Sequence, residues 1–399
     1  MDLNGLLPEL VARIASLRRD LHAHPELAFA ETRTAEVVAT HLKKLGIEVH
    51  EGIAGTGVVG CLKLGDSARA IGLRADMDAL PLPELNTFPH RSRHPDRMHA
   101  CGHDGHTALL LGAAEALQRL GDNGNFDGTV YFIFQPAEEH EGGGRVMVEE
   151  GLFERFPMQM VFGLHNWPGL PAGSMAVMDG PVMAGADRFE IVITARGSHA
   201  AMPHQGTDAI LAGADLVQAV QSLVSRATDP QEAAVVSVTR FHAGHADNIL
   251  PEQAVLGGTV RTFRPGLQDA LEAGLGRICT GIETTHRVRA ELHYARGYPP
   301  TVNATEPTQI CRNVARQIVG DEQVFSHMKP SMGAEDFAYL ANAVPGCYVW
   351  LGNGSGEGGC MLHSPHYDFN DEIIATGIRY WVRLVEQALA GDRRSVKLA

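Results

Sequence analysis

Two continuous runs of β-forming apolar residues, each followed at once by polar residues, constrain the fold of this chain most strongly. The runs cover residues 129–134 and 160–164. Continuous runs of this kind are typical of strands that a parallel sheet buries on both faces. The first ends at Gln135-Pro136-Ala137-Glu138-Glu139 and the second at His165-Asn166-Trp167. Because open α/β sheets place their sites beyond the carboxyl ends of such strands, we expect the chemistry of this chain there.

Helical and strand-like segments alternate through the first half of the chain and again near its end. The hydrophobic spacing predicts helices over 6–20, 32–45 and 107–120, and short strands over 58–64 and 70–74. A helix over 305–319, a strand over 347–351 and a helix over 371–389 follow later. The alternation predicts an α/β fold with a mainly parallel, twisted sheet that is flanked by helices.

The pattern changes between residues 184 and 295. Strands are predicted over 189–195, 234–241, 255–263 and 288–294, with helices over 209–224 and 267–285. The order β-α-β-β-α-β is that of a ferredoxin-like α+β unit. We therefore predict two domains. A catalytic metal-binding domain is built from 1–183 and 296–399, and a second domain, 184–295, is inserted into it.

Composition excludes several classes of function. The formal net charge of −14 argues against a nucleic-acid partner and against an anionic membrane surface. No uncharged apolar run reaches the roughly 18 residues of a membrane span, and Asp2, Glu9 and Arg13 interrupt the region where a signal peptide would be apolar. The six cysteines form no C-x-x-C pair, which makes a disulfide framework unexpected and favours a cytoplasmic location.

The segment 98–106 contains Cys101-Gly102-His103, whose thiol and imidazole are ligand types that suit zinc or a similar metal. The C-x-H spacing differs from that of a structural zinc finger, and Gly102 would let both side chains point to one centre from a loop. Asp104 and His106 could orient such ligands. Taken alone, the segment fits a buried cysteine with incidental histidines equally well.

Glu138 and Glu139 are adjacent carboxylates that directly follow a buried strand. Their mutual repulsion and their desolvation make the pair costly, and a bound metal would relieve that cost. One carboxylate could then bind the metal while its neighbour acts as a general base. A solvated loop is the alternative, which the nearby Glu141 favours.

Four further polar residues are candidates for the site only when they are considered together. His165 closes a predicted strand and His363 lies near the end of the chain, and each alone is compatible with a hydrogen-bonded structural histidine. His199 and Asn248 lie in the predicted inserted domain, away from the other candidates in sequence. The residue pattern alone leaves the roles of all four open.

Taken together, these residues and motifs resemble those of the zinc-dependent aminoacylase and carboxypeptidase superfamily. Within it, the chain is most similar to the hippurate hydrolase, or N-acyl-L-amino acid amidohydrolase, branch, which also holds the plant auxin-conjugate hydrolases. Motifs in the expected order carry the resemblance over nearly the whole chain, at 21–27, 73–81, 98–106, 135–139, 163–166, 197–204, 248–251, 333–337 and 362–365.

The resemblance implies a dinuclear site for divalent ions, either zinc or manganese, cobalt or nickel. The implied ligands are Cys101, His103, Glu139, His165 and His363. Glu138 matches the general base of the family. His199 matches a histidine that, in dimeric relatives, reaches into the site of the neighbouring subunit, and Asn248 matches a lid residue that contacts substrate. The resemblance therefore implies that the inserted domain acts as a lid and forms the interface of a homodimer or higher oligomer.

The expected activity is hydrolysis of the amide bond of an N-acyl amino acid, hippurate-like or N-acetylated, by water that the metals activate. Three alternatives stay open. The first is a metallo-exopeptidase that cleaves dipeptides at the same site. The second is a non-catalytic metal-binding or dimerisation module. The third is a cysteine hydrolase that uses Cys101 with His103 and would survive a chelator.

Overall fold

A computed structural model describes residues 2–121, 126–139, 141–355 and 361–390 of the chain. The chain divides into two compact units. The larger comprises Met1–Val182, Val302–Lys329 and Asp336–Ala399, and the smaller comprises Met183–Thr301 and Pro330–Glu335. The smaller unit thus extends beyond the segment 184–295 that the sequence pattern assigned to an inserted domain. Its role as a lid stays a prediction.

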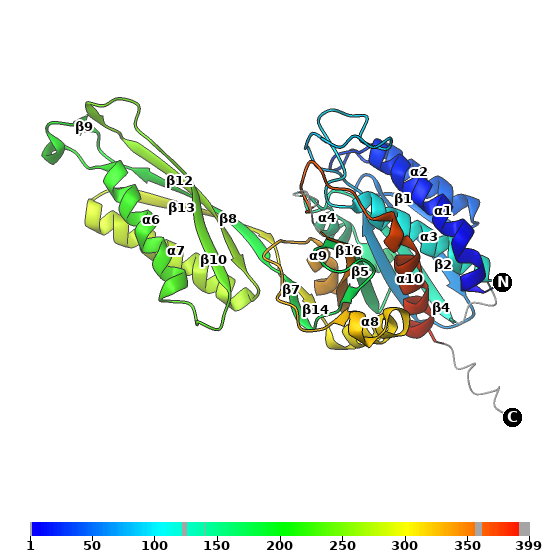
Figure 1. Cartoon of the computed structure of the whole chain (residues 1–399). Helices are drawn as coiled ribbons and strands as arrows, with labels where there is room; N and C mark the ends of the chain where they lie inside the picture. Colours follow the sequence, from blue (N-terminus) through cyan, green and yellow to red (C-terminus); the bar gives the residue numbers. More distant parts are fainter. Residues whose placement is uncertain (1, 122–125, 140, 356–360, 391–399) are drawn as a thin grey trace. The chain divides into compact units, whose positions relative to one another are not determined.

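An eight-stranded sheet forms the centre of the larger unit (Figure 1), in the order β1-β2-β4-β3-β5-β16-β6-β15. Its strands are β1 (Glu48–Ile53), β2 (Gly57–Leu64), β3 (Ala70–Asp76), β4 (Gly128–Gln135), β5 (Met160–Pro168), β6 (Met175–Ala176), β15 (Val324–Phe325) and β16 (Gly346–Gly354). The four central strands β4, β3, β5 and β16 run parallel, whereas β1, β2 and β4 pair antiparallel. The predicted α/β fold with a mainly parallel sheet is confirmed.

Helices cover the sheet because its central strands carry apolar residues on both faces. The helices of the larger unit are α1 (Leu3–Ala23), α2 (Thr32–Lys44), α3 (His103–Leu120), α4 (Gly143–Glu149), α5 (Leu152–Arg155), α8 (Thr305–Val319), α9 (Phe337–Ala343) and α10 (Ile374–Ala388). Helix α3 packs against β3, and α1 and α10 pack against α3. On the other side of the sheet, Phe337 of α9 lies 5.2 Å from Tyr348 of β16 between ring centroids.

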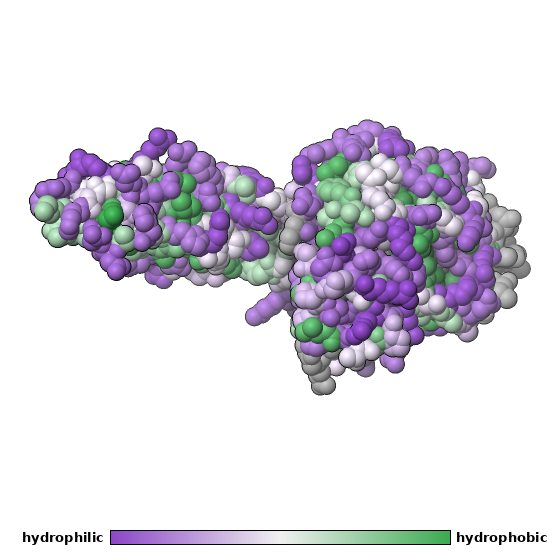
Figure 2. All heavy atoms as spheres, turned by 90° about the horizontal axis from the view of Figure 1, so that it is seen from above, coloured by the Kyte–Doolittle hydropathy of each residue, from purple (hydrophilic) through white to green (hydrophobic). Residues whose placement is uncertain are grey.

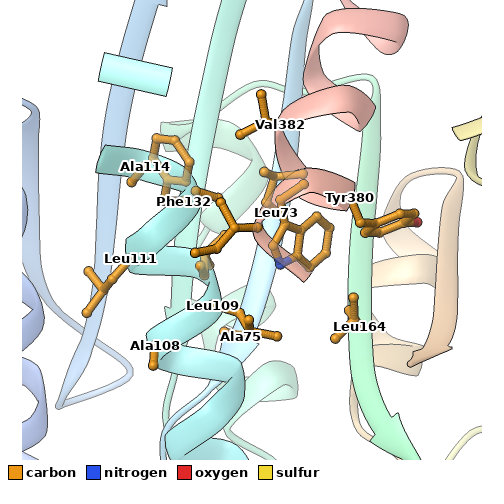
Figure 3. Packing of buried hydrophobic residues seen from close by; sticks show 14 of the residues in the cluster. Leu73, Ala75, Ala108, Leu109, Leu111, Ala114, Phe132, Leu164, Tyr380 and Val382 are labelled. Atoms are coloured by element: carbon orange, nitrogen blue, oxygen red, sulfur yellow. The ribbon is translucent and has the colours of Figure 1, made fainter. Parts of the chain in front are cut away.

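Helix α3 is apolar almost all round because the sheet and neighbouring helices enclose it. Figure 3 shows Leu109 and Leu111 of α3 in the cluster that also contains Phe132 of the sheet and Val382 of α10. The sequence pattern placed the start of this helix at residue 107, and that start is wrong, since the helix begins at His103. The polar first turn interrupts the apolar spacing and hides the true beginning.

The smaller unit has the element order β8 (Gly185–Thr194), α6 (Ala209–Ser225), β10 (Ala234–Ala243), β12 (Gln253–Thr262), α7 (Pro265–His286) and β13 (Arg289–Tyr298). The four strands form an antiparallel sheet in the order β10-β12-β8-β13, and α6 and α7 pack together against it (Figure 1). Buried residues alternate along β8, as expected for a sheet with one covered face. A short pair, β9 (Ser198–His199) with β11 (Ile249–Leu250), lies outside this sheet.

The surface that Figure 2 shows is largely hydrophilic in both units, with scattered apolar residues. Among the described residues, no helix combines the length and the apolar character that crossing a membrane requires.

Candidate metal centre and active site

Cys101 and His103 lie on either side of Gly102, the residue that immediately precedes α3. Gly102 has φ +93°, and a Cβ at this position would lie 2.1 Å from Oδ1 of Asn166. Only glycine fits this backbone without strain and without that overlap. Both flanking side chains are buried. The sequence predicted that Cys101 and His103 both lie on a loop. That prediction is wrong for His103, which is the first residue of α3, whereas Cys101 precedes the helix.

Asp78 follows β3 and contacts two segments that carry candidate ligands. Its Oδ1 lies 3.2 Å from Nδ1 of His103, and its Oδ2 accepts the backbone N–H of Glu139 at 2.9 Å. A histidine that donates from Nδ1 to a carboxylate presents its Nε2 lone pair to a metal. Sequence reasoning gave Asp78 no role. Its position just beyond a buried strand is the same signal that singled out Glu138 and His165.

Glu138 and Glu139 follow β4 in a tight turn. The side chain of Glu138 is buried, and the backbone N–H of Asp336 points at its Oε1 from 3.4 Å. Oε1 of Glu139 lies 3.1 Å from Nε2 of His363 and 4.0 Å from Nε2 of His103. Burial would raise the pKa of Glu139, but the hydrogen bond from His363 and the charge of His103 hold it below its ordinary value. The pair therefore does not sit on the solvated loop that was the alternative.

His165 and His363 reach the same place from β5 and from the segment before α10. Nδ1 of His165 donates to the backbone carbonyl of Asn166 at 2.6 Å, and its Nε2 lies 3.4 Å from Sγ of Cys101. Burial, followed by the charge of His106, lowers the pKa of His165 well below its ordinary value, so the ring is neutral. His363 has φ +64°, and its backbone N–H donates to the carbonyl of Ala100 at 2.8 Å.

These residues fit a pair of divalent ions. Among the described residues, five groups have potential ligand atoms that all lie within 4.8 Å of one another. Three of them consist of predicted site residues, namely Cys101 with His103 and His165, Cys101 with Glu139 and His363, and His103 with Glu138 and Glu139. Nε2 of His103 is buried and makes no hydrogen bond with any described residue. Burial would lower the pKa of His103, but the charges of Asp76 and Asp78 raise it to about 10. The surroundings thus favour a positive charge at Nε2, where a metal ion would replace the proton.

The predicted residues His199 and Asn248 lie in the smaller unit and are neighbours there. The backbone N–H of Ala200 donates to the carbonyl of Asn248 at 2.9 Å, and Ile249 pairs with His199. Both side chains belong to exposed residues. The N–H of Ala201 donates to Nδ1 of His199 at 3.1 Å. In the neutral ring the proton is therefore on Nε2, which can act as a hydrogen-bond donor.

A buried ion network lies behind the first turn of α3. Asp104, which follows His103, accepts from Nδ1 of His22 at 2.9 Å and lies 3.5 Å from Arg18. His22 also lies 3.2 Å from Glu84 through Nε2. Burial alone would lower the pKa of His22, but the charge of Asp104 and the hydrogen bonds to Asp104 and Glu84 raise it to about 9. His22 is therefore charged at neutral pH and ties α1 to the start of α3.

Comparison with known proteins identifies the family of this chain. Residues 72–387 match the Peptidase family M20/M25/M40. This chain belongs to that family. The hippurate hydrolase of Campylobacter jejuni is 40% identical over 383 residues, which cover 95% of this chain and 98% of that protein. The N-acyl-L-amino acid amidohydrolase of Geobacillus stearothermophilus is 42% identical over 306 residues, 76% of this chain and 82% of the relative.

A solved M20 structure extends the agreement to the fold. The Bacillus subtilis YXEP protein, a dinuclear metal-binding peptidase of the M20 family, has a TM-score of 0.84 and 34% identity, and covers 96% of this chain and 99% of its own. The predicted superfamily and branch, and the prediction of a hydrolase, are confirmed. Divalent metal ions and a small amide substrate are supported, whereas the metal, the ligand set and the oligomeric state stay predictions.

The charge on His22 predicts how the stability of this M20 chain depends on pH. Its pKa is raised from 6.5 to about 9 by folding, so its contribution is complete below pH 6.5 and is lost as the pH rises through about 9. The advantage of the wild type over His22→Gln in the free energy of unfolding should shrink across this window by roughly 3 kcal/mol. Urea unfolding of the metal-free wild type and of His22→Gln at a series of pH values measures this difference in the free energy of unfolding. A constant difference would contradict the charged state of His22.

Proposed function

We propose that this chain hydrolyses the amide bond of N-acyl amino acids, releasing a carboxylate and a free amino acid. The observation that carries the proposal is the buried Glu138, which lies beside Glu139 and within 4.8 Å of the ligand atoms of His103. A carboxylate held next to a metal site and not needed as a ligand is suited to move protons. The names of the hippurate hydrolase and amidohydrolase relatives support the substrate class.

The proposed ligands are Cys101, His103, Glu139, His165 and His363. When bound, two divalent ions polarise the amide carbonyl and lower the pKa of a water molecule toward neutrality. We propose zinc, because a thiolate and several imidazoles suit a borderline-soft ion, with manganese, cobalt or nickel as substitutes. Glu138 accepts the proton of the attacking water at its carboxylate and then gives that proton to the nitrogen of the departing amine.

His199 is proposed to act from the smaller unit of a partner chain, and Asn248 is proposed as a lid residue of the smaller unit. Because Nδ1 of His199 accepts from a backbone N–H, its Nε2–H can donate to the oxygen that becomes negative during attack. Asn248 would contact the substrate. The smaller unit carries exposed apolar side chains, which support a homodimer that forms through this unit. These residues are Met202, Ile210, Leu211, Phe241 and Ile249.

The alternatives differ from the proposal in what they require. A cysteine hydrolase needs a thiol with a lowered pKa, whereas burial and the charge of Glu139 raise the pKa of Cys101 well above its ordinary value. A non-catalytic module would have no use for a buried carboxylate at Glu138. An exopeptidase would use the same groups, so only the substrate separates it from an amidohydrolase.

A cytoplasmic location is kept as part of the proposal. Five cysteines in the described part of the chain, Cys61, Cys101, Cys279, Cys311 and Cys347, are free thiols. Unbonded cysteines are the usual state in a reducing compartment.

The substrate class can be tested on the metal-loaded enzyme with matched pairs of compounds. N-benzoyl and N-acetyl forms of one amino acid are compared with a dipeptide that ends in the same residue. We expect a higher kcat/KM for the N-acyl compounds and complete loss of activity with a chelator, reversed by added zinc. Preference for the dipeptide would establish the exopeptidase, and activity that survives chelation would overturn the metal mechanism.

The role of Glu138 can be separated from metal binding. Glu138→Ala should lower kcat by about 10²- to 10⁴-fold, the range for loss of a general base, while elemental analysis still finds the wild-type metal content. Glu141→Ala is the matched control, because Glu141 is an exposed carboxylate on the same turn. It should keep the wild-type kcat. A Glu138→Ala enzyme with full activity would refute the assignment.

The contribution of His199 from a partner chain can be tested by complementation. Glu138→Ala and His199→Ala chains are inactive separately but should regain activity when co-expressed and purified through two different tags. A mixed dimer has one of its two sites with both residues intact, so the doubly purified sample should have about half of the wild-type activity per dimer. Size-exclusion chromatography with light scattering confirms the dimer. No recovery in a proven mixed dimer would show that His199 does not act across subunits.

A further inference from the structure

The backbone just before Glu138 has an unusual conformation. Ala137 has φ +54°, in the left-handed region that residues with a Cβ rarely adopt. Such a conformation persists only where the surrounding structure holds it. Because Ala137 directly precedes Glu138 and Glu139, its backbone angles set the directions in which both carboxylates leave the chain.

A distant carboxylate contacts this residue. Glu31 is fully buried, and its Oε1 accepts the backbone N–H of Ala137 at 2.8 Å. Its other oxygen, Oε2, accepts from the hydroxyl of Thr56 at 2.6 Å. Both oxygens are thus engaged, and the position of the carboxylate relative to the turn is fixed from two sides.

Glu31 stands at the N-terminus of α2 but does not cap it. No backbone N–H of α2 donates to its side chain. Glu26 takes over that task, with Oε1 accepting from the N–H of Arg33 at 3.0 Å and Oε2 accepting from the N–H of Thr34 at 2.8 Å. Glu26 therefore caps the start of α2, whereas Glu31 binds the turn after β4.

The other contacts of the turn do not replace Glu31. The carbonyl of Ala137 accepts from the N–H of Gly143 at 2.9 Å, and the N–H of Glu139 donates to Asp78 at 2.9 Å. These contacts fix the carbonyl side of Ala137 and the residue after Glu138. The amide side of Ala137 is held by Glu31.

We infer that Glu31 is a positioning residue of the active site, which holds Ala137 in its left-handed conformation and thereby aims Glu138. The inference deepens the proposed function, since it rests on Glu138 as the general base. What the turn needs from Glu31 is an acceptor oxygen. Burial raises the pKa of Glu31 to about 7, so its neutral form is accessible near neutral pH. A glutamine, which keeps one acceptor oxygen in the same shape, should therefore replace it.

The kinetic test compares Glu31→Gln with Glu31→Leu on an N-acyl amino acid. The leucine variant should lose about 10- to 100-fold in kcat, as expected when a catalytic group is misplaced, with KM and metal content near wild type. The glutamine variant should keep kcat within about threefold. Glu26→Ala is the matched control, because it weakens the same helix end without touching the turn, and should lower Tm but not kcat. An unchanged kcat in Glu31→Leu, or a change in KM alone, would overturn the inference.

A second measurement does not depend on hydrolysis. Hydrogen exchange of the peptide that covers residues 133–139, followed by mass spectrometry on the metal-free protein, reports the Ala137 amide. It should exchange faster in Glu31→Leu than in the wild type and at the wild-type rate in Glu31→Gln. Equal protection in all three would overturn the inference. If the wild type hydrolyses no N-acyl amino acid, the proposed function fails, and the exchange result still decides the contact.

A double variant tests whether Glu31 acts through the conformation of Ala137. Glycine adopts the left-handed region without strain, so Ala137→Gly should reduce the need for Glu31. The loss of kcat caused by Glu31→Leu should therefore be several-fold smaller in the Ala137→Gly background. Equal losses in both backgrounds would show that Glu31 does not act through the conformation of Ala137.

Discussion

The carboxylate of Asp78 is the contact on which the geometry of the candidate metal centre depends. One oxygen holds Nδ1 of His103 at the start of α3, and the other holds the N–H of Glu139 after β4. These partners come from different elements, and Asp78 itself follows β3. A single carboxylate therefore fixes the orientation of an imidazole and of a neighbouring acid together. Ligands that are oriented before the metal arrives lose less freedom on binding, which strengthens binding.

Buried arginines offset the negative charge of several carboxylates near this centre. Arg74 donates to Asp76 at 2.7 Å and to Asp336 at 2.9 Å. Arg18 lies 2.7 Å from Asp368 and 3.5 Å from Asp104. An acid that is buried without such a partner is strongly destabilising. Arg74 and Arg18 therefore compensate carboxylates that lie next to the candidate metal centre.

The sequence predicts most of this site because residue type and strand end coincide. Glu138 follows the buried strand β4, and His165 lies within β5 near its carboxyl end, so the parallel strands bring both residues to one edge of the sheet. His363 could be selected only by family resemblance, because a left-handed backbone and a backbone hydrogen bond to the carbonyl of Ala100 position it. Asp78 also follows a buried strand, β3, and so carries the same signal in the sequence. The two-residue strands β6 and β15 are too short for any pattern to reveal.

Long-range contacts of the backbone are what the sequence could not provide. Glu31 lies 106 residues from Ala137, and nothing in the pattern of either segment points to the other. An acidic residue at the start of a helix is ordinarily read as a cap, which is the role that Glu26 has taken instead. The two acids can be told apart only when the groups that donate hydrogen bonds to them are known.

The use of alanine rather than glycine at position 137 follows from the same contact. Glycine would reach the left-handed region at no cost, but it would reach other regions equally well, and the base would then sample several directions. Alanine has few alternatives in a tight turn, so an acceptor that stabilises its left-handed form leaves one dominant conformation. The strain at Ala137 and the buried carboxylate of Glu31 therefore make sense together, because each alone would destabilise the fold and both together give Glu138 a single position.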